Sequence, residues 1–446
     1  MPEVVVIGGG LAGSEAAWQA ARFGIAVTIY EMRPNVQTEA HRTGLLGELV
    51  CSNSLRSNLP DTAHGLLKQE LTRLGSLIME AARQTSVPAG SALAVDRTRF
   101  AEFITNAVES NPNIRVIREE LSNLSELSPV ASDGTPKVYI LATGPLTSPT
   151  MSKSLTEMLG QEALFFYDAI APVIDADTID YSQVFSASRY GKGGDDYINC
   201  PMDAQCYSAF YDALVAADRV AVRDFEDSRV FEGCMPIEAM AARGINTPRF
   251  GPMKPVGLID PQTQKQPWAV VQLRTENTQK SAYNMVGFQT RLKYPEQQRV
   301  FRMIPGLQNA EFLRFGSVHR NTYINSPTYL NSGLAIKGHE HILLAGQITG
   351  VEGYVESTAM GLFAGITAAR KVKSLPHILP AETTSTGALI KYVTTEQKHG
   401  AFQPSNINFS LFPQLEVKTK DKNIRRKLIV ERALTDIDGF IKAAYR

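Results

Sequence analysis

The sequence has few cysteines, and their spacing argues against both disulfide bonds and a metal site. Among 446 residues there are four, Cys51, Cys200, Cys206 and Cys234, with no Cys-x-x-Cys pair and no histidine at a zinc-like spacing. Structural zinc sites need closely spaced thiols and imidazoles, and disulfide frameworks need many paired cysteines. We therefore expect no metal, and we expect reduced thiols in a cytoplasmic setting.

An excess of one charge and long apolar runs are also missing. Lys plus Arg equals Asp plus Glu, at 45 each, so a polyanion would have to bind a local basic cluster. Every apolar stretch is short or broken by glycine and charge, so we expect neither a membrane span nor a signal peptide. The chain shows no repeats, its length of 446 residues predicts two or three domains, and its 43% of hydrophobic residues predict a globular protein.

The N-terminus carries a glycine-rich turn between a strand and a helix. The segment EVVVIGGGLAGSEAAWQAARFGIAVTIYE predicts a strand, a helix and a second strand. Gly8 allows the tight turn, Gly10 lets the backbone approach a pyrophosphate, and Gly13 lets helix and strand pack closely. Glu31, at the end of the second strand, is placed to accept a hydrogen bond from a ribose hydroxyl. A dinucleotide site is predicted, against the alternative of a glycine turn in an ordinary β-α-β unit.

Two later segments favour FAD over NAD. KVYILATGP predicts a strand that ends at a loop containing Gly144. HILLAGQITGVEGYVESTAMGLFAGITAAR predicts another strand, a loop with Gly346 and Gly350, and a helix that begins near Ser357. Together they resemble the FAD-binding fold of the glutathione-reductase class, so these residues are expected to bind the cofactor. No second Gly-x-Gly-x-x-Gly follows a strand, so NAD(P)H would reach the flavin through a shared cleft.

Two helical faces are predicted from residue spacing. Gly361, Ala364, Gly365 and Ala368 form a face of small residues that can lie close to a sheet or to an isoalloxazine ring. In TAHGLLKQELTRLGSLIMEAAR, four apolar residues fall on one helical face that is expected to pack in the core. These are Leu67, Leu71, Leu74 and Ile78.

The fold class predicted is α/β, an FAD-binding Rossmann-like (glutathione-reductase type) fold with an inserted α+β domain. The FAD fold is expected over 1–165 and again over 319–375, with a substrate domain inserted at 166–318. The remaining segment, 376–446, contains the basic run KTKDKNIRRK at 418–427. A solvated helix face is the more usual reason for such a run, and the binding of phosphate groups is the alternative.

Several segments, in order along nearly the whole chain, carry a family resemblance. They are GGGLAGSEAA, CSNSLRSN, VPAGSALAVDR, KGGDDYINCPM, FEGCMPIE, SVHRNTYINSP and AGQITGVEGYVES. They resemble the signature segments of the folate- and FAD-dependent tRNA (uracil-5-)-methyltransferases. The resemblance implies methylation of a T-loop uridine of tRNA, position 54 of that RNA, to 5-methyluridine. Methylenetetrahydrofolate would donate the carbon, reduced FAD would supply the hydride, and NAD(P)H would reduce the FAD.

The resemblance also implies roles for individual residues. Cys234 would add to carbon 6 of uracil and so activate carbon 5, and Cys51 would be a second functional cysteine in a supporting role. Glu238, four residues after Cys234, would oppose thiolate formation if it lay close, so its position favours a role in binding substrate or moving a proton. Four polar residues in matching segments could hold the pterin, the flavin or phosphate. They are Lys192, His319, Arg320 and Asn321.

Purely structural roles remain open for these residues. Cys234 could be a packed core thiol, Cys51 a structural thiol and His319 a scaffold histidine. For the whole chain, the alternatives are the same chemistry on a ribosomal RNA uridine, an FAD-dependent oxidoreductase of a small metabolite, and a flavin-bearing RNA-binding protein.

Overall fold

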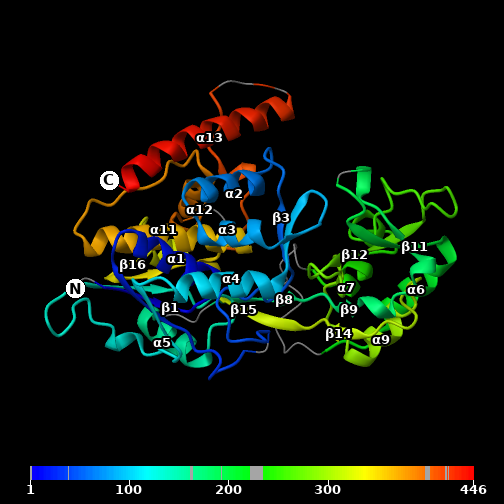
Figure 1. Cartoon of the computed structure of the whole chain (residues 1–446), viewed down its shortest axis with the longest axis horizontal. Helices are drawn as coiled ribbons and strands as arrows, with labels where there is room; N and C mark the ends of the chain where they lie inside the picture. Colours follow the sequence, from blue (N-terminus) through cyan, green and yellow to red (C-terminus); the bar gives the residue numbers. More distant parts are fainter. Residues whose placement is uncertain are drawn as a thin grey trace.

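The structure is a computed structural model of the whole chain, and it describes most residues. The described ranges are 3–38, 40–160, 164–191, 193–220, 235–396, 402–416, 419 and 421–445, with the backbone alone at 164–168 and 319–320. Figure 1 shows two lobes, each built around one six-stranded sheet.

The first lobe holds a mostly parallel sheet in the order β16-β17-β7-β1-β2-β6. Its strands are β1 (Glu3–Ile7), β2 (Ala26–Tyr30), β6 (Ile114–Ile117), β7 (Lys137–Leu141), β16 (Ala335–Ile336) and β17 (His339–Leu344). The strand β1 lies between β2 and β7, and β17, almost two hundred residues later, pairs in parallel with β7. The carboxyl ends of β1, β7 and β17 therefore meet at one edge of the sheet, where ligands bind in such folds.

Two helices pack against each other on this sheet. They are α1 (Leu11–Arg22) and α11 (Tyr354–Val372). A Cβ added at Gly361 would collide with the backbone of Ala12, and one at Gly365 would collide with that of Ala16. Gly361 and Gly365 of the predicted small face therefore serve the close approach of two helices, a partner that the sequence did not predict, and α11 also contacts strand β7 of the sheet.

Further helices of the first lobe cover its remaining surfaces. They are α2 (Ala63–Arg73), α3 (Leu77–Gln84), α4 (Arg97–Glu109), α5 (Pro149–Leu159), α10 (Ser326–Tyr329), α12 (Ser385–Thr394) and α13 (Lys422–Ala444), with a small sheet of β3 (Ser54–Ser57), β4 (Ser86–Val87) and β5 (Ala92–Val95). The four apolar residues predicted to share one helical face are all buried, but they belong to two helices. Gly75, with φ of 72°, ends the first helix, and the Ser76 side chain caps the second by accepting from the Met79 N–H.

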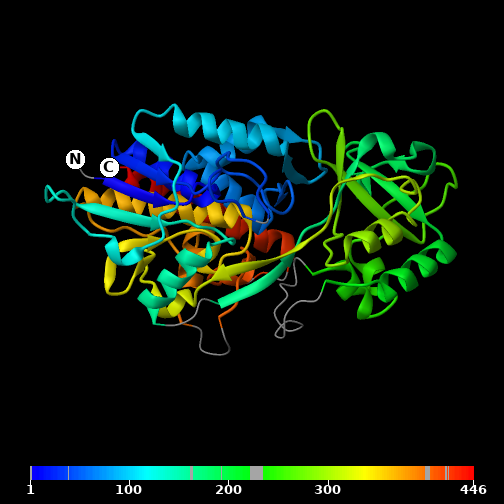
Figure 2. The same ribbon diagram turned by 90° about the horizontal axis from the view of Figure 1, so that it is seen from below.

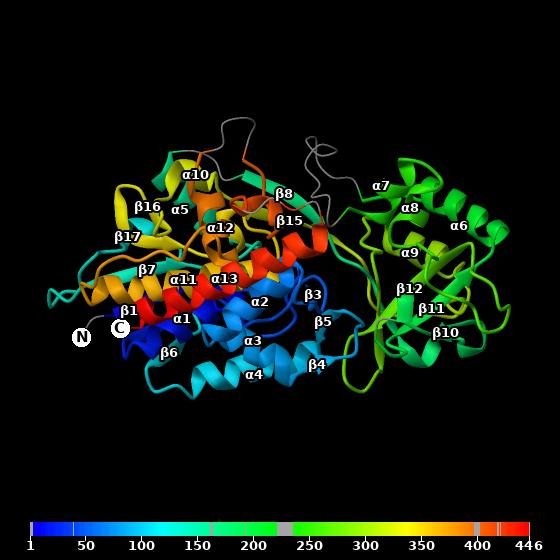
Figure 3. The ribbon, with the colours of Figure 1, turned by 90° about the horizontal axis from the view of Figure 1, so that it is seen from above.

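The helix α13 lies across α2, as Figure 3 shows. Ile429, Ala433, Ile437 and Phe440 are buried on one of its faces. Arg73 of α2 donates to the Leu434 carbonyl at 3.0 Å and to the Asp438 carboxylate at 2.8 Å. Helix α13 is therefore held against the first lobe by its buried apolar face and by the hydrogen bonds of Arg73.

The second lobe holds an antiparallel sheet in the order β10-β11-β12-β13-β9-β14. Its strands are β9 (Val173–Asp175), β10 (Phe185–Ser186), β11 (Tyr197–Met202), β12 (Ala269–Thr275), β13 (Ala282–Met285) and β14 (Phe312–Arg314). Its helices are α6 (Ala204–Ala216), α7 (Ile237–Ala242), α8 (Thr247–Phe250) and α9 (Tyr294–Phe301). A separate apolar core fills this lobe.

A two-stranded ribbon joins the lobes. It pairs β8 (Leu164–Ala169) with β15 (Val318–Tyr323), and Figure 2 shows it along the underside of the first lobe, pointing toward the second. In the described ranges, no helix has both the length and the apolar character needed to cross a bilayer. Nor do the described residues bring three His, Cys, Asp or Glu side chains together as metal ligands.

Candidate active site

The glycine turn after β1 has the geometry that the sequence predicts. Gly8 has φ of 103°, and a Cβ there would lie 2.5 Å from the Ala142 carbonyl oxygen. A Cβ at Gly13 would collide with the carbonyl of Gly8, so this glycine allows helix α1 to pack against the turn. Around Gly10 no atom lies within 4 Å of an added Cβ. The backbone at Gly10 is therefore open to a ligand at the N-terminus of α1.

This turn forms one wall of a cavity at the carboxyl edge of the first sheet. The cavity holds about 960 Å³ of empty space, within the range of about 300–1,000 Å³ usual for small-molecule and cofactor sites. The predicted cofactor-binding residues that line it are Gly8, Gly10, Glu31, Gly144, Gly346 and Ser357. Segments some 350 residues apart in the sequence thus meet at one site.

Two predicted cofactor residues do not line this cavity. Gly13 is taken up in the packing of α1, as described above. Gly350 has φ of 83°, and a Cβ there would collide with the ring of Phe402. Gly350 therefore lets the chain turn tightly under Phe402 just before α11.

The carboxylate of Glu31 is buried and already well bonded. It accepts from the Gly9 N–H at 2.8 Å and from the Arg33 Nε at 2.9 Å. Burial alone would raise the pKa of the Glu31 carboxyl, but the hydrogen bonds and charge of Arg33 outweigh burial and hold this pKa below its usual range. The Glu31 carboxylate is therefore a fixed negative charge at the cavity wall, and Arg33 is a functional neighbour that the sequence did not reveal.

A second cavity adjoins the first and contains Cys51. It holds about 990 Å³ of empty space, and both Cys51 and Asn321 line it. The two cavities share four lining residues, namely Val50, Pro145, Gln347 and Tyr354. We call the second cavity the Cys51 chamber. The first cavity and the Cys51 chamber are therefore separated by a shared wall made of these four residues.

Tyr354 is a functional candidate that sequence reasoning missed. It is the first residue of α11, it lines both cavities, and its hydroxyl accepts from the Cys51 N–H at 2.8 Å. Its segment, AGQITGVEGYVES, carried the family resemblance, and an aromatic residue directly after Gly353 at a helix start was the available signal.

Arginines surround the backbone of Cys51. Arg97 and Arg314 donate from Nη2 to the Cys51 carbonyl at 2.9 and 3.0 Å. Arg97 is paired with the buried Glu276 at 2.5 Å. Burial opposes the charged form of Arg97, but the attraction of Glu276 outweighs burial and raises the Arg97 pKa. Burial and the nearby Arg97 lower the pKa of Arg314 to about 10, so Arg314 remains a cation at neutral pH.

The other predicted substrate residues divide into two groups. Asn321, on β15, is 1% exposed and lines the Cys51 chamber. His319 and Arg320 lie on the same strand, but their side chains are outside the described part of the structure. Cys234 and Lys192 lie outside the described residues altogether, so the predicted nucleophile stays a prediction.

Glu238 stabilises a turn of the second lobe. Its carboxylate is fully buried and accepts from the Thr290 hydroxyl and from the Arg291 N–H, each at 2.8 Å. Burial raises the pKa of the Glu238 carboxyl against these hydrogen bonds. These contacts stabilise the fold of the second lobe. They give a structural reason for a carboxylate four residues after the predicted nucleophile in the sequence.

Comparison with known proteins identifies the family of the chain. The sequence model of the family described as "Glucose inhibited division protein A" matches residues 3–376. A protein of Moorella thermoacetica is 54% identical over 432 residues, covering 97% of each chain. One of Geotalea uraniireducens is 55% identical over 441 residues, covering 98% of each. Both are named "Methylenetetrahydrofolate--tRNA-(uracil-5-)-methyltransferase TrmFO". The chain belongs to the TrmFO family.

Solved structures of a protein named GidA show the same fold. Two crystal forms of GidA from Aquifex aeolicus have TM-scores of 0.71 and 0.69 to this chain, at 18% and 19% sequence identity. They cover 99% of this chain and 74% and 77% of the GidA chain. The predicted family and the predicted fold class are thus both confirmed, the first by relatives of similar length and the second by structural likeness.

Proposed function

We propose that this member of the TrmFO family methylates carbon 5 of a T-loop uridine in tRNA. Methylenetetrahydrofolate would donate the carbon, and reduced FAD would supply the hydride. The strongest support comes from relatives that are more than 50% identical to this chain over nearly the full length of both chains. The name of these relatives states a methyl transfer from methylenetetrahydrofolate to uracil in tRNA. The two adjoining cavities provide room for a cofactor and for a substrate base.

The first cavity fits FAD by its own geometry. The open backbone at Gly10 and the N-terminus of α1 suit the pyrophosphate, and the fixed carboxylate of Glu31 suits a ribose hydroxyl. Bound FAD supplies the hydride that reduces a carbon at the formaldehyde level to a methyl group. In the described ranges the second sheet has no parallel strand pair. NAD(P)H is therefore proposed to visit the first cavity and not a nucleotide fold of its own.

Cys234 is proposed as the nucleophile toward carbon 6 of uracil. Addition of its thiolate makes carbon 5 electron-rich, so carbon 5 can attack the one-carbon unit. Release of tetrahydrofolate from the transferred carbon, loss of the carbon 5 proton, addition of one hydride to that carbon and expulsion of the thiolate would then give the methylated base. Cys234 is followed directly by Met235 and by helix α7, and both have buried side chains in the second lobe.

Cys51, which lines the chamber, is proposed to act in a supporting role. The two guanidinium groups on its carbonyl oxygen and the Tyr354 hydroxyl on its N–H hold its backbone at both polar atoms. The nearby positive charge favours an anion at this position, whether the Cys51 thiolate or a carboxylate of the folate.

The lobes themselves support the proposed domain plan. Strands of the first sheet come from residues 3–141 and 335–344, and those of the second sheet come from 173–314. This division agrees with an inserted substrate domain at about 166–318. A cytoplasmic setting, where tRNA and reduced folates are found together, belongs to the same proposal.

The proposal is tested by following a labelled carbon. The purified protein is incubated with labelled methylenetetrahydrofolate, NADPH and either an unmodified tRNA transcript or a ribosomal RNA fragment. We expect labelled 5-methyluridine in the tRNA, none from a Cys234→Ala variant that retains FAD, and a large loss of rate in Cys51→Ala.

Three results would count against parts of the proposal. Product from Cys234→Ala would remove Cys234 as the nucleophile. Label in the ribosomal fragment alone would change the substrate. NADPH oxidation without label transfer to either RNA would indicate a small-molecule oxidoreductase.

A further inference from the structure

A groove between the two lobes has a composition that neither cavity shares. It holds about 1,790 Å³ of empty space, open to solvent. Arg42 of the first lobe lines one side, and Arg291, Tyr294, Arg314 and Phe315 of the second lobe line the other. Among the described residues that line it there are three arginines and no Asp or Glu.

Aromatic rings form a stacked column on the second-lobe side of the groove. Tyr294 stacks on Phe315 with ring centroids 4.7 Å apart and planes 17° apart. Phe315 stacks on Phe312 at 5.3 Å and 14°. Phe312 in turn contacts Phe301, which is fully buried in the second core. The column is therefore rooted in the core, and its geometry is fixed before any ligand arrives.

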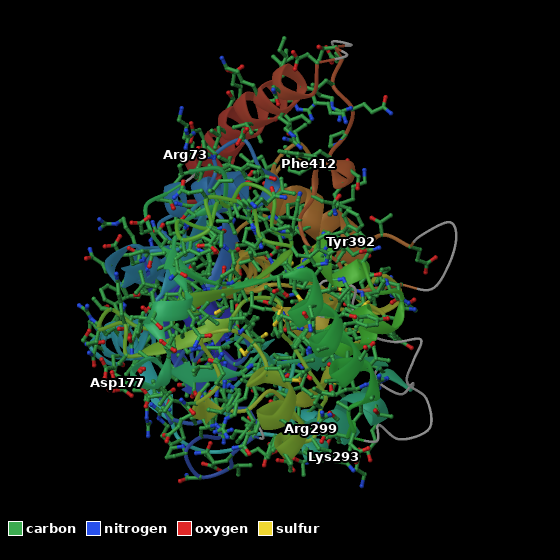
Figure 4. All side chains as sticks on the ribbon, turned by 90° about the vertical axis from the view of Figure 1, so that its right-hand side faces the viewer. Arg73, Asp177, Lys293, Arg299, Tyr392 and Phe412 are labelled. Carbon is green, nitrogen blue, oxygen red and sulfur yellow. The ribbon has the colours of Figure 1, made fainter. Side chains whose placement is uncertain are left out.

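The outer end of this column is open. Tyr294 is 55% exposed, although one face of its ring is covered by Phe315. Lys293, which precedes it at the start of α9, lies at the surface near Arg299, as Figure 4 shows. A further flat ring could extend the stack on the free side of Tyr294.

The arginines make the groove positive although some have acidic neighbours. The Arg291 Nε lies 3.9 Å from Oε1 of the buried Glu238. Arg314 is close to both Glu276 and Arg97. Arg42 is exposed and lines the groove, and its backbone N–H donates to the Glu48 carboxylate at 2.8 Å. A groove with guanidinium groups and an open aromatic stack matches a single-stranded nucleic acid, which presents phosphates and flat bases in alternation.

Arg314 connects the groove to the Cys51 chamber. Arg314 lines the groove, and its guanidinium donates to the Cys51 carbonyl at 3.0 Å. An RNA strand bound in the groove would therefore be separated from the Cys51 chamber by Arg314. A base that enters the chamber must leave its stack, and the strand beside it must be held while this happens.

We propose that this groove binds the single-stranded RNA segment next to the target uridine. A neighbouring base stacks on Tyr294, and Arg42 binds a phosphate of the same segment. The choice of a tRNA loop as the RNA rests on the proposed function, whereas the affinity of the groove for a single strand rests on its own residues.

The test measures RNA affinity in Tyr294→Leu, which keeps an apolar side chain but removes the ring. Its partner variants are Tyr294→Trp, which restores a stacking face, and Arg42→Gln. Matched controls are Phe250→Leu, an aromatic residue of the second lobe that is 81% exposed elsewhere, and Arg83→Gln on the exposed face of α3. The Kd for an unmodified tRNA transcript is measured at several salt concentrations, together with FAD content and the rate of 5-methyluridine formation.

The inference predicts a specific pattern among these variants. Tyr294→Leu should raise Kd by about 5- to 150-fold, which corresponds to the ~1–3 kcal/mol typical of one base–aromatic stack. Tyr294→Trp should restore the affinity. Arg42→Gln should raise Kd and reduce the salt slope by about 0.7–0.9, the contribution of one phosphate contact. The two controls should stay within about twofold, and FAD content should not change.

Failure of this inference is distinguishable from failure of the proposed function. If the wild type forms 5-methyluridine while Tyr294→Leu keeps its affinity, or Phe250→Leu loses as much affinity, the groove is not the RNA site and the methyltransferase proposal survives. If the wild type forms no product but binds RNA in a Tyr294-dependent way, the groove inference stands without the proposed function.

Discussion

At the scale of single residues, the site combines a local glycine turn with a cluster of residues from distant parts of the chain. Gly8 and Gly10 form a tight turn with an open backbone, a geometry that depends on a few consecutive residues. The surroundings of Cys51 depend on Arg97, Glu276 and Arg314, which are dispersed over more than two hundred residues. No local pattern relates them, since the fold alone brings them together.

Glu276 is expected to stabilise the buried arginines Arg97 and Arg314 by compensating their charge. Its Glu276→Gln variant leaves Arg97 and Arg314 without their compensating charge, so we expect a loss of about 3–5 kcal/mol in the free energy of unfolding. Chemical denaturation followed by far-UV circular dichroism measures it. Glu80→Gln, on an exposed helix face, is the control and should change little. An equal loss in both variants would contradict a special role for the buried pair.

The same residue predicts a pH dependence of stability. Burial raises the pKa of Glu276, but Arg97 outweighs burial and holds it below the unfolded value of a glutamate, which is about 4.3. The folded state therefore binds fewer protons, and the stability from this carboxylate is present above about pH 4 and is lost as pH falls through the folded pKa. The free energy of unfolding, measured from about pH 7 down to about pH 3, should fall more steeply in wild type than in Glu276→Gln.

Tyr354 offers a residue-scale test of how the Cys51 loop is held. Tyr354→Phe removes the acceptor of the Cys51 N–H but keeps the ring that lines both cavities. We expect methyl transfer to slow by about 2- to 10-fold, the value of one neutral hydrogen bond of ~0.5–1.5 kcal/mol. FAD content, read from flavin absorbance, should be unchanged. A loss of FAD instead would mean that the hydroxyl serves the first cavity and not the loop.

At the scale of elements, the sequence predicted burial better than it predicted boundaries. The four apolar residues predicted to share a face, Leu67, Leu71, Leu74 and Ile78, are all in the core, but the helix breaks at Gly75 because this residue adopts φ of 72°. The small face of α11 was recognised, yet its partner was not, since a strip of glycine and alanine fits a helix as well as a sheet. Spacing identifies which face is buried, and only tertiary structure identifies what covers it.

The basic N-terminal end of α13 gives the element-scale prediction. Asp421 caps this helix, and Lys422, Arg425 and Arg426 are exposed on its first turns, away from the buried stripe. We expect the triple change of these cations to alanine to weaken tRNA binding and to lower the salt slope by about 0.9 for each phosphate that the variant no longer binds. Filter binding at several salt concentrations measures both. Flavin content is the control, and an unchanged Kd at low salt would exclude α13 from the RNA surface.

At the scale of the whole molecule, two separately cored lobes meet through polar contacts near the Cys51 chamber. Asn53 donates from Nδ2 to the Thr275 carbonyl at 3.0 Å, and Asp96 accepts from the Thr278 N–H at 3.0 Å. The sequence indicated an insertion but could not reveal this junction, because hydrogen bonds between distant loops leave no periodic pattern. Both the chamber and the groove depend on residues from each lobe, so their geometry depends on this junction.

Asp96 allows the junction to be tested against a matched control. Asp96 caps α4 by accepting from the Arg99 N–H and also bonds to Thr278 across the junction, whereas Asp203 caps α6 within one lobe. Asp203→Ala should cost about 1 kcal/mol, the usual value of a helix cap. Asp96→Ala should cost about 1 kcal/mol more for the contact between lobes. Asp96→Ala should also slow methyl transfer while Asp203→Ala does not, because only the first change loosens the lobes around the chamber. Equal losses of stability and equal rates in the two variants would show that the lobes are held together elsewhere.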